Sequence, residues 1–300
     1  MSRAVRFTRY GGSEVLEFVA VDEPHAGAGK VRVAVRAAGA NPFDSKVRAG
    51  DVPELTPPRG QGSEFAGVVD ELGDGVTSLA LGDEVLGWAP SCQADFVVAR
   101  ATSVTAKPSG LGWVTAGGLG LVGNTALRAC AAVAPGPDDT VLVSGVTGGV
   151  GVLSAQFAVR AGATVIGMAR EAHHDFLRSI GIVPVAYGDG LAKTLAAVAP
   201  EGITAVLDSV GSQVVELALA LGVPASRINS VAVDDGAATY GISTAGGGGK
   251  TAAELGELAM LAASGELVLP IRATFSFAQV RAAYQELDHG HGLGKIVLVP

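Results

Sequence analysis

One segment near the middle of the chain constrains the fold more than any other. Residues 141–151 read Val-Leu-Val-Ser-Gly-Val-Thr-Gly-Gly-Val-Gly, and residues 152–161 continue with the apolar periodicity of a helix. A β-rich run, a glycine turn and a helix bring backbone N–H groups and the positive end of a helix dipole to one point, where a pyrophosphate can bind. The residues that we expect to contact such a group are Gly145, Thr147, Gly148, Gly149, Val150 and Gly151.

The spacing of these glycines leaves a structural alternative open. Gly145, Gly148 and Gly151 follow the pattern Gly-x-x-Gly-x-x-Gly, whereas the dinucleotide fingerprint is Gly-x-Gly-x-x-Gly. The chain has 43 glycines among 300 residues, so a purely structural turn also explains the pattern. The position of the turn inside a strand, helix and strand unit favours nucleotide binding.

The segment 115–249 alternates short β-rich runs with helical patterns. Strands are expected at 140–144, 164–169, 184–186, 205–208 and 228–232, and helices at 115–133, 150–161, 172–180, 191–198 and 213–221. Neighbouring parallel strands need a crossover, and the crossover is nearly always right-handed. This alternation therefore predicts an α/β domain with a doubly wound parallel sheet of the Rossmann type.

The first hundred residues and the last fifty have a different rhythm. Strands are expected at 4–8, 31–37, 65–72, 84–87 and 94–99, with a proline-rich surface loop at 53–62. After residue 249 the expected elements are a helix at 252–264, a β-like run at 268–275, a helix at 277–289 and a strand at 295–299. We expect a discontinuous, mainly-β domain from 1–114 and 250–300, and a Rossmann domain at 115–249.

The composition of the chain limits the kinds of binding partner that we expect. The 21 Lys and Arg against 29 Asp and Glu give a net charge of −8, which argues against a nucleic-acid partner. We find no uncharged apolar run of the ~20 residues that a membrane span needs, so no membrane partner is expected. The two cysteines, Cys92 and Cys130, and the lack of a secretory signal pattern favour a reducing cytoplasm. The expected partner is a small-molecule substrate.

The end of the second strand of a Rossmann unit faces the adenosine ribose and separates the two nicotinamide cofactors. An acidic residue there accepts from a 2′-hydroxyl, and a cation holds a 2′-phosphate. Arg170 stands at this place, with His174 close behind, and together they favour NADPH. A solvated helix-cap arginine is the alternative for Arg170, and the adjacent Glu171 keeps it open. For His174 the alternative is a surface residue that binds no ligand.

The chain resembles the medium-chain dehydrogenase/reductase superfamily, in particular its zinc-free quinone oxidoreductase branch, which includes zeta-crystallin-like enzymes. The resemblance covers nearly the whole chain and rests on the glycine turn together with residues 41–50, 62–69, 81–87 and 294–298. It implies a GroES-like substrate domain, a Rossmann domain, bound NADPH and a homodimer. Zinc-dependent relatives carry cysteine and histidine where this chain has Asn41 and Ser63, so no metal is expected.

The resemblance also implies roles for individual residues. Asn41 and Lys46 are the expected catalytic residues, although a turn residue and a solvated lysine are the plain alternatives. Asp44 and Arg48 are expected to form a local ion pair. Further cofactor contacts are expected from Asn124, Thr125, Tyr187, Asp208, Ser209, Val210 and Lys295.

Three functions are consistent with these residues. The first is an NADPH-dependent, zinc-independent reductase of quinones or α,β-unsaturated carbonyl compounds, in which the protein orients the hydride donor and stabilises developing negative charge. The second is an enoyl reductase or tailoring enzyme of a biosynthetic pathway that acts on thioesters or larger substrates. The third is an NADPH-binding protein without catalysis.

Overall fold

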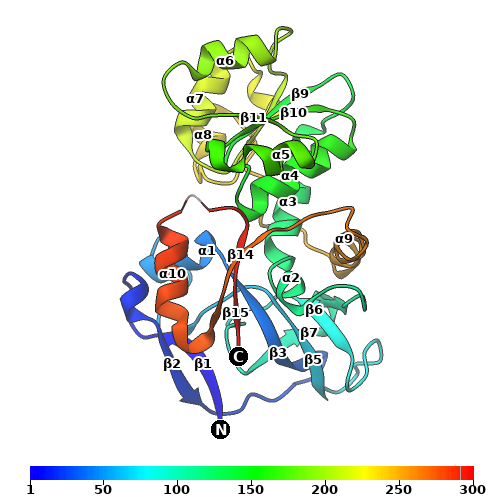
Figure 1. Ribbon diagram of the computed structural model, residues 1–300. Helices are drawn as coiled ribbons and strands as arrows, with labels where there is room; N and C mark the ends of the chain where they lie inside the picture. The colour runs from blue at the N-terminus through cyan, green and yellow to red at the C-terminus, as the bar shows by residue number, and fades with distance from the viewer. Residues whose placement is uncertain (291) are drawn as a thin grey trace. The chain divides into compact units, whose positions relative to one another are not determined.

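The computed structural model describes residues 1–290 and 292–300, and the chain divides into two compact units. Unit 1 comprises residues 1–121 and 250–300, and unit 2 comprises residues 122–249 (Figure 1). The first boundary lies later than the expected position after residue 114. The reason is that helix α2 (Trp113–Gly117) packs on strands β3 (Lys30–Ala40) and β5 (Phe65–Leu72) of unit 1.

Unit 1 is built on β-sheets, as the alternating patterns predicted. A three-stranded sheet has the order β2-β1-β4, and a larger sheet runs β14-β15-β3-β5-β6-β8, with β7 also paired to β3. The remaining strands are β1 (Ser2–Phe7), β2 (Glu17–Val21), β4 (Arg59–Gly60), β6 (Glu84–Gly87), β7 (Phe96–Arg100), β8 (Val104–Ala106), β14 (Ile271–Ser276) and β15 (Lys295–Val299).

The tail of the chain completes this unit. Strand β15 pairs antiparallel with β3, placing Val297 opposite Gly39, and β14 pairs parallel with β15. Helix α9 (Ala252–Ser264) packs on β8, and α10 (Val280–Asp288) packs on β14 and β15. The core therefore joins residues from both ends of the chain, including Phe7, Phe65, Phe277, Tyr284 and Leu298.

Unit 2 confirms the predicted Rossmann-type sheet. Its five parallel strands have the order β11-β10-β9-β12-β13. The strands are β9 (Thr140–Val143), β10 (Thr164–Met168), β11 (Val183–Val185), β12 (Ala205–Asp208) and β13 (Ile228–Ser230). The helices are α3 (Gly120–Val133), which begins in unit 1, then α4 (Gly149–Arg160), α5 (His174–Ser179), α6 (Leu191–Val198), α7 (Ser212–Ala220) and α8 (Gly236–Tyr240).

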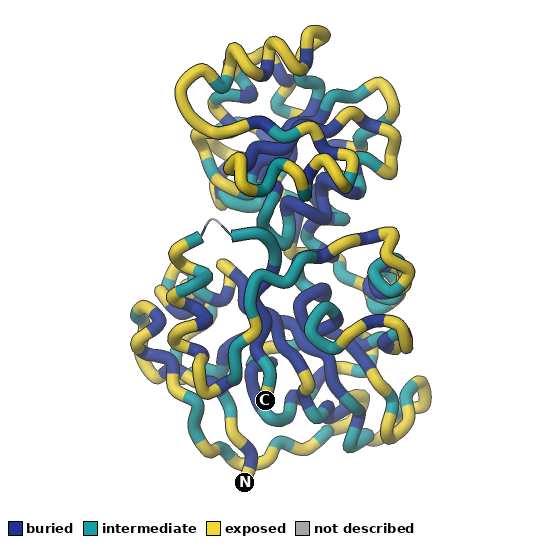
Figure 2. The backbone as a smooth tube through the Cα atoms, in the orientation of Figure 1, coloured by how far each residue is buried: buried dark blue, intermediate teal, exposed yellow. Residues whose placement is uncertain are grey.

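Both faces of this sheet are buried, as a doubly wound sheet requires. Val141 and Val143 of β9 pack in one apolar cluster with α4, and Leu142 between them packs in another with α7. Figure 2 shows the sheet strands as buried and α6 as largely exposed. No helix among the described residues is both long and apolar enough to cross a membrane.

Several local features differ from the expectations. The single helix expected at 115–133 is broken into α2 and α3, because Gly118 leaves the helical region and Gly117 lies against Ala37. The loop expected at 53–62 ends in β4, which pairs with β1. Helix α1 (Pro42–Ala49) was not predicted, although Pro42 at its first turn, Asp44 two residues later and Gly50 after its end are ordinary helix signals.

Candidate functional site

The glycine turn of unit 2 has the geometry of an anion site. Gly145 has a φ of +57°, and its carbonyl accepts from the Gly148 N–H at 2.9 Å. Gly148 precedes α4, and in the described part of the chain no side chain caps this helix. A Cβ on Gly151 would lie 2.2 Å from the Gly145 oxygen, so only glycine fits there. The first N–H groups of α4 are thus available to a phosphate.

Tyr187 lies at the same turn. Its hydroxyl accepts from the Gly145 N–H at 3.2 Å, and the residue remains 46% exposed. Desolvation of the hydroxyl raises the pKa of Tyr187, so this group stays protonated at neutral pH. Tyr187 therefore hydrogen-bonds to the turn and stays partly exposed beside it.

Asp208 anchors the neighbouring loop at the carboxyl end of β12. Its buried carboxylate accepts hydrogen bonds from the hydroxyls of Ser144 and Ser230 and from the backbone N–H groups of Val210 and Gly211. The Ser144 hydroxyl oxygen in turn accepts from the Ser209 N–H at 3.0 Å. With its oxygens engaged in this way, Asp208 acts on the site by fixing Ser209 and Val210, and Val210 stays 51% exposed.

The residues predicted to contact a 2′-phosphate lie just beyond β10. Arg170 is exposed, and no hydrogen bond or ion pair from another described residue holds its guanidinium. His174 begins α5, and its Nε2 lies 3.3 Å from the Ala169 carbonyl oxygen. Arg170 is therefore the cation available at this strand end, and His174 is tied to the backbone.

Asn124 and Thr125 lie on α3, Asn124 buried and Thr125 half-buried. The glycine run 246–249 lies beside this helix. A Cβ on Gly246 would lie 3.2 Å from the Thr125 methyl, and the Arg128 guanidinium donates to the carbonyls of Gly248 and Gly249. These contacts hold the glycine run against α3.

Unit 1 contains a buried polar cluster around Asn41. The Asn41 N–H donates to Asp44 Oδ2 at 2.9 Å, as in a helix capping box, and its side-chain amide donates to Glu64 Oε1 at 2.9 Å. All three side chains are at least 97% buried. The expected ion pair of Asp44 with Arg48 was wrong, because Arg48 pairs with Asp288 at 3.1 Å.

Glu64 and Lys295 form the charged centre of this cluster. Lys295 Nζ lies 3.1 Å from Glu64 Oε1 and also donates to the Ala40 carbonyl, and Glu64 Oε2 accepts from the Leu121 N–H at 2.6 Å. These contacts give the Lys295 charge a partner within unit 1. Its contact with a cofactor stays a prediction, as does the catalytic role of Lys46, which is half-buried on α1.

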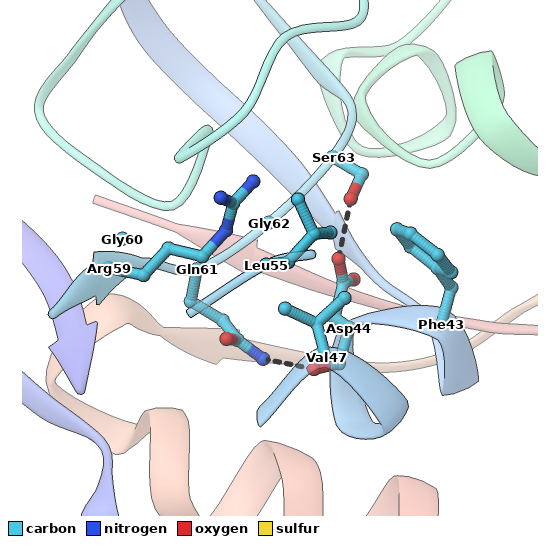
Figure 3. Close-up of a pocket in the computed structure, with 9 residues that line it drawn as sticks. All are labelled: Phe43, Asp44, Val47, Leu55, Arg59, Gly60, Gln61, Gly62 and Ser63. Carbon is cyan, nitrogen blue, oxygen red and sulfur yellow. Dashed lines mark hydrogen bonds between the residues drawn. The ribbon is translucent and has the colours of Figure 1, made fainter. Parts of the chain in front are cut away.

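A small cavity of about 20 Å³ adjoins the cluster (Figure 3). The Asp44 carboxylate and the Ser63 hydroxyl face one another in it, with an oxygen–oxygen distance of 2.6 Å. Burial raises the pKa of the Asp44 carboxyl against the opposing effects of Ser63, Lys295 and Asn41. The sequence pattern singled out neither Asp44 nor Glu64 for the site. The partners of Glu64, which are Asn41, Lys295 and the Leu121 N–H, are all remote along the chain.

A mainly-β unit joined to a parallel nucleotide-binding sheet is the architecture of two-domain dehydrogenases and reductases. Residues 27–138 match the alcohol dehydrogenase GroES-like domain, and residues 182–298 match the zinc-binding dehydrogenase family. The chain belongs to the medium-chain dehydrogenase/reductase superfamily, which confirms the resemblance found in the sequence. It is an oxidoreductase of this superfamily, whose members use NAD(P)H.

Two solved structures are similar over the whole chain. The quinone oxidoreductase from Coxiella burnetii is 29% identical with a TM-score of 0.89, and the match covers 100% of this chain and 99% of that one. Mycobacterial Rv1454c, solved in complex with NADPH, is 25% identical with a TM-score of 0.89 and full coverage of both chains.

A curated relative differs in size. The pikromycin polyketide synthase component PikAII of Streptomyces venezuelae is 33% identical over 298 residues, which is 91% of this chain. The chain spans only 8% of the length of that relative. The chain therefore matches one region of that much longer relative.

The second family is named for zinc, which needs ligands that the described residues of unit 1 do not offer. Structural and catalytic zinc sites use Cys, His, Asp or Glu. Among residues 1–290 and 292–300 no group of three or more such side chains could hold a metal ion, and His291 lies outside the described residues. Asn41 and Ser63 are instead hydrogen-bonded to Glu64 and Asp44. The residues present do not fit a zinc site.

Proposed function

We propose that this protein is an NADPH-dependent reductase that transfers hydride to a quinone or to a carbon–carbon double bond conjugated with a carbonyl. The observation that carries the proposal is the uncapped start of α4 among the described residues, where the Gly151 position excludes any Cβ. A turn this tight, followed by the first N–H groups of α4 without a side-chain cap, suits a pyrophosphate. The similarity to quinone oxidoreductases supports the acceptor class.

The residues present fit the cofactor. In this proposal the N–H groups of Gly149, Val150 and Gly151 hold the pyrophosphate, and the Arg170 guanidinium holds the 2′-phosphate. The bound cofactor supplies the hydride. The chain supplies orientation and a place for the negative charge that develops on the substrate oxygen. Asn41 and Lys46 are the proposed substrate contacts.

The proposal is tested by following NADPH absorbance in a stopped-flow instrument with a panel of quinones and enones. We expect single-exponential loss of absorbance with at least one acceptor of these classes. NADPH that binds tightly, without reduction of any acceptor in a broad panel, would instead support a binding protein without catalysis.

A second candidate is an enoyl thioester reductase, and the match to a polyketide synthase over 91% of the chain favours it. Both candidates add hydride to an acceptor activated by a carbonyl. In the second candidate that carbonyl belongs to a thioester, and in the first it belongs to a quinone or an enone. Crotonyl thioesters of N-acetylcysteamine and of coenzyme A belong in the same panel. Turnover confined to the thioesters would favour the second candidate, and turnover confined to quinones would exclude it.

Replacing Arg170 with aspartate is expected to weaken NADPH binding about 100-fold and NADH binding less than about threefold. Charge-assisted hydrogen bonds to a phosphate contribute roughly 1.5–3 kcal/mol, and NADH lacks that phosphate. Isothermal titration calorimetry of both cofactors measures the effect. Arg178→Ala is the matched control, because Arg178 is an exposed arginine of α5 that pairs with Asp175. Equal weakening of both cofactors would refute the role of Arg170.

A further inference from the structure

The proposed reduction needs a proton as well as a hydride, and the cavity of unit 1 holds an acid and a hydroxyl in contact. Ser63 Oγ donates to Asp44 Oδ1 at 2.6 Å, and both side chains line the cavity (Figure 3). Phe43, Val47 and Leu55 form its apolar wall. A short hydrogen bond between a carboxyl and a hydroxyl is the geometry along which a proton can move.

Burial makes Asp44 an unusual carboxyl. Its side chain is 97% buried, and loss of hydration raises its pKa above the ordinary ~3.9. The hydrogen bonds from Ser63 and Asn41 oppose this shift without overturning it. Asp44 therefore holds its proton to a higher pH than a surface aspartate does.

Other charged and titratable groups also face Asp44. They are Glu64, Lys295, Lys250, Cys92, Tyr284 and, at the cavity, Arg59. Glu64 favours the protonated carboxyl, and the cations favour the ionised one. Burial raises the pKa values of Cys92 and Tyr284 well above their ordinary range, so both stay neutral.

The cavity has room for water beside this pair. Its volume is about 20 Å³, and one water molecule needs roughly 10–15 Å³. Gln61 also lines it and donates from its amide to the Asp44 carbonyl at 3.1 Å. A water molecule here would have polar partners and could return a proton to Asp44.

We propose that Asp44 and Ser63 form the proton relay that completes the reduction, an inference that rests on the proposed function. A nicotinamide held by the α4 turn would give up its C–H hydride to form a new C–H or O–H bond on the substrate, which would leave an oxyanion or enolate. That anion takes the Ser63 hydroxyl proton as the Ser63 O–H bond breaks. With Asp44 protonated, the hydrogen bond between the two oxygens runs from the carboxyl to Ser63, so Ser63 takes the carboxyl proton as the Asp44 O–H bond breaks. Asp44 then takes a proton from solvent through the cavity. The substrate gains two electrons and two hydrogens, and the enzyme returns to its starting state.

Kinetics of three serine variants test the relay. Ser63→Ala is expected to lower kcat about 100-fold with KM within about threefold, because general acid catalysis contributes at least that much. Ser63→Thr keeps the hydroxyl and is expected to retain most of kcat. Ser45→Ala is the control, since Ser45 donates to Asp288 and does not line the cavity. Wild-type kcat for Ser63→Ala would overturn the relay.

The pH profile and the carboxyl itself give independent readouts. Only protonated Asp44 can donate, so wild-type kcat is expected to fall as pH rises through the raised pKa, and this limb is absent from Ser63→Ala. Infrared titration of the cofactor-free protein is expected to show a protonated carboxyl above pH ~3.9 that Asp44→Asn lacks. Titration at or below the ordinary value would overturn the relay. Because this readout needs no substrate, it separates failure of the relay from failure of the proposed function.

Discussion

Replacing Lys295 with methionine is expected to lower the free energy of unfolding of unit 1 by about 3–5 kcal/mol, the usual result of removing one member of a buried ion pair. Lys295 is 4% exposed and Glu64 is fully buried, with 3.1 Å between Nζ and Oε1. Methionine fills a similar volume but leaves the Glu64 carboxylate with only N–H donors. The loss therefore comes from an uncompensated buried charge and not from a cavity.

Tryptophan fluorescence during urea unfolding measures this effect in unit 1 alone, because Trp88 and Trp113 are the chain's two tryptophans and both belong to that unit. The matched control is the double variant Glu64→Gln, Lys295→Met, which removes both charges. It is expected to recover a large part of the lost stability, and the cycle yields the coupling energy. A single variant within about 1 kcal/mol of wild type would contradict the pairing.

The Rossmann sheet could be predicted because its signals are local. Most strands of unit 2 are short buried runs followed by a periodic helix, so residues a few positions apart carry the information. The break at Gly118 could not be predicted in this way. Gly117 must be glycine because a Cβ there would lie 2.5 Å from Ala37, a contact between segments that are remote in sequence.

In the candidate site, too, the residues with local sequence signals could be predicted and those with remote partners could not. The glycine turn could be predicted from one strand, the turn after it and one helix. Arg170 could be predicted from its place after the next strand. The side-chain partners of Asp208, Glu64 and Lys295 come from other elements, and no spacing rule joins them. Sequence reasoning named Asp208 and Lys295 by their places in the family pattern, and only the structure shows that both are held by other buried side chains.

Replacing Gly151 with alanine is expected to reduce NADPH affinity at least about 100-fold. The new Cβ would lie 2.2 Å from the Gly145 oxygen, 2.7 Å from its carbonyl carbon and 2.9 Å from the Val146 Cα. All three are backbone atoms, so no side chain can move aside and the turn itself must open. Opening the turn misaligns the α4 N–H groups. Each hydrogen bond from such a group to a bound anion contributes roughly 1.5–3 kcal/mol to the binding free energy.

Calorimetric titration with NADPH measures the loss, and circular dichroism shows whether unit 2 keeps its helices. Gly136→Ala is the matched control, because that glycine also lies in unit 2, has no atom within 4 Å of an added Cβ and does not need a positive φ. It is expected to bind NADPH as the wild type does. Since alanine favours a helix interior by about 1 kcal/mol over glycine, weaker binding by Gly151→Ala cannot come from lower helix propensity. Affinity within about threefold of wild type in a folded Gly151→Ala protein would remove the α4 turn as the pyrophosphate site.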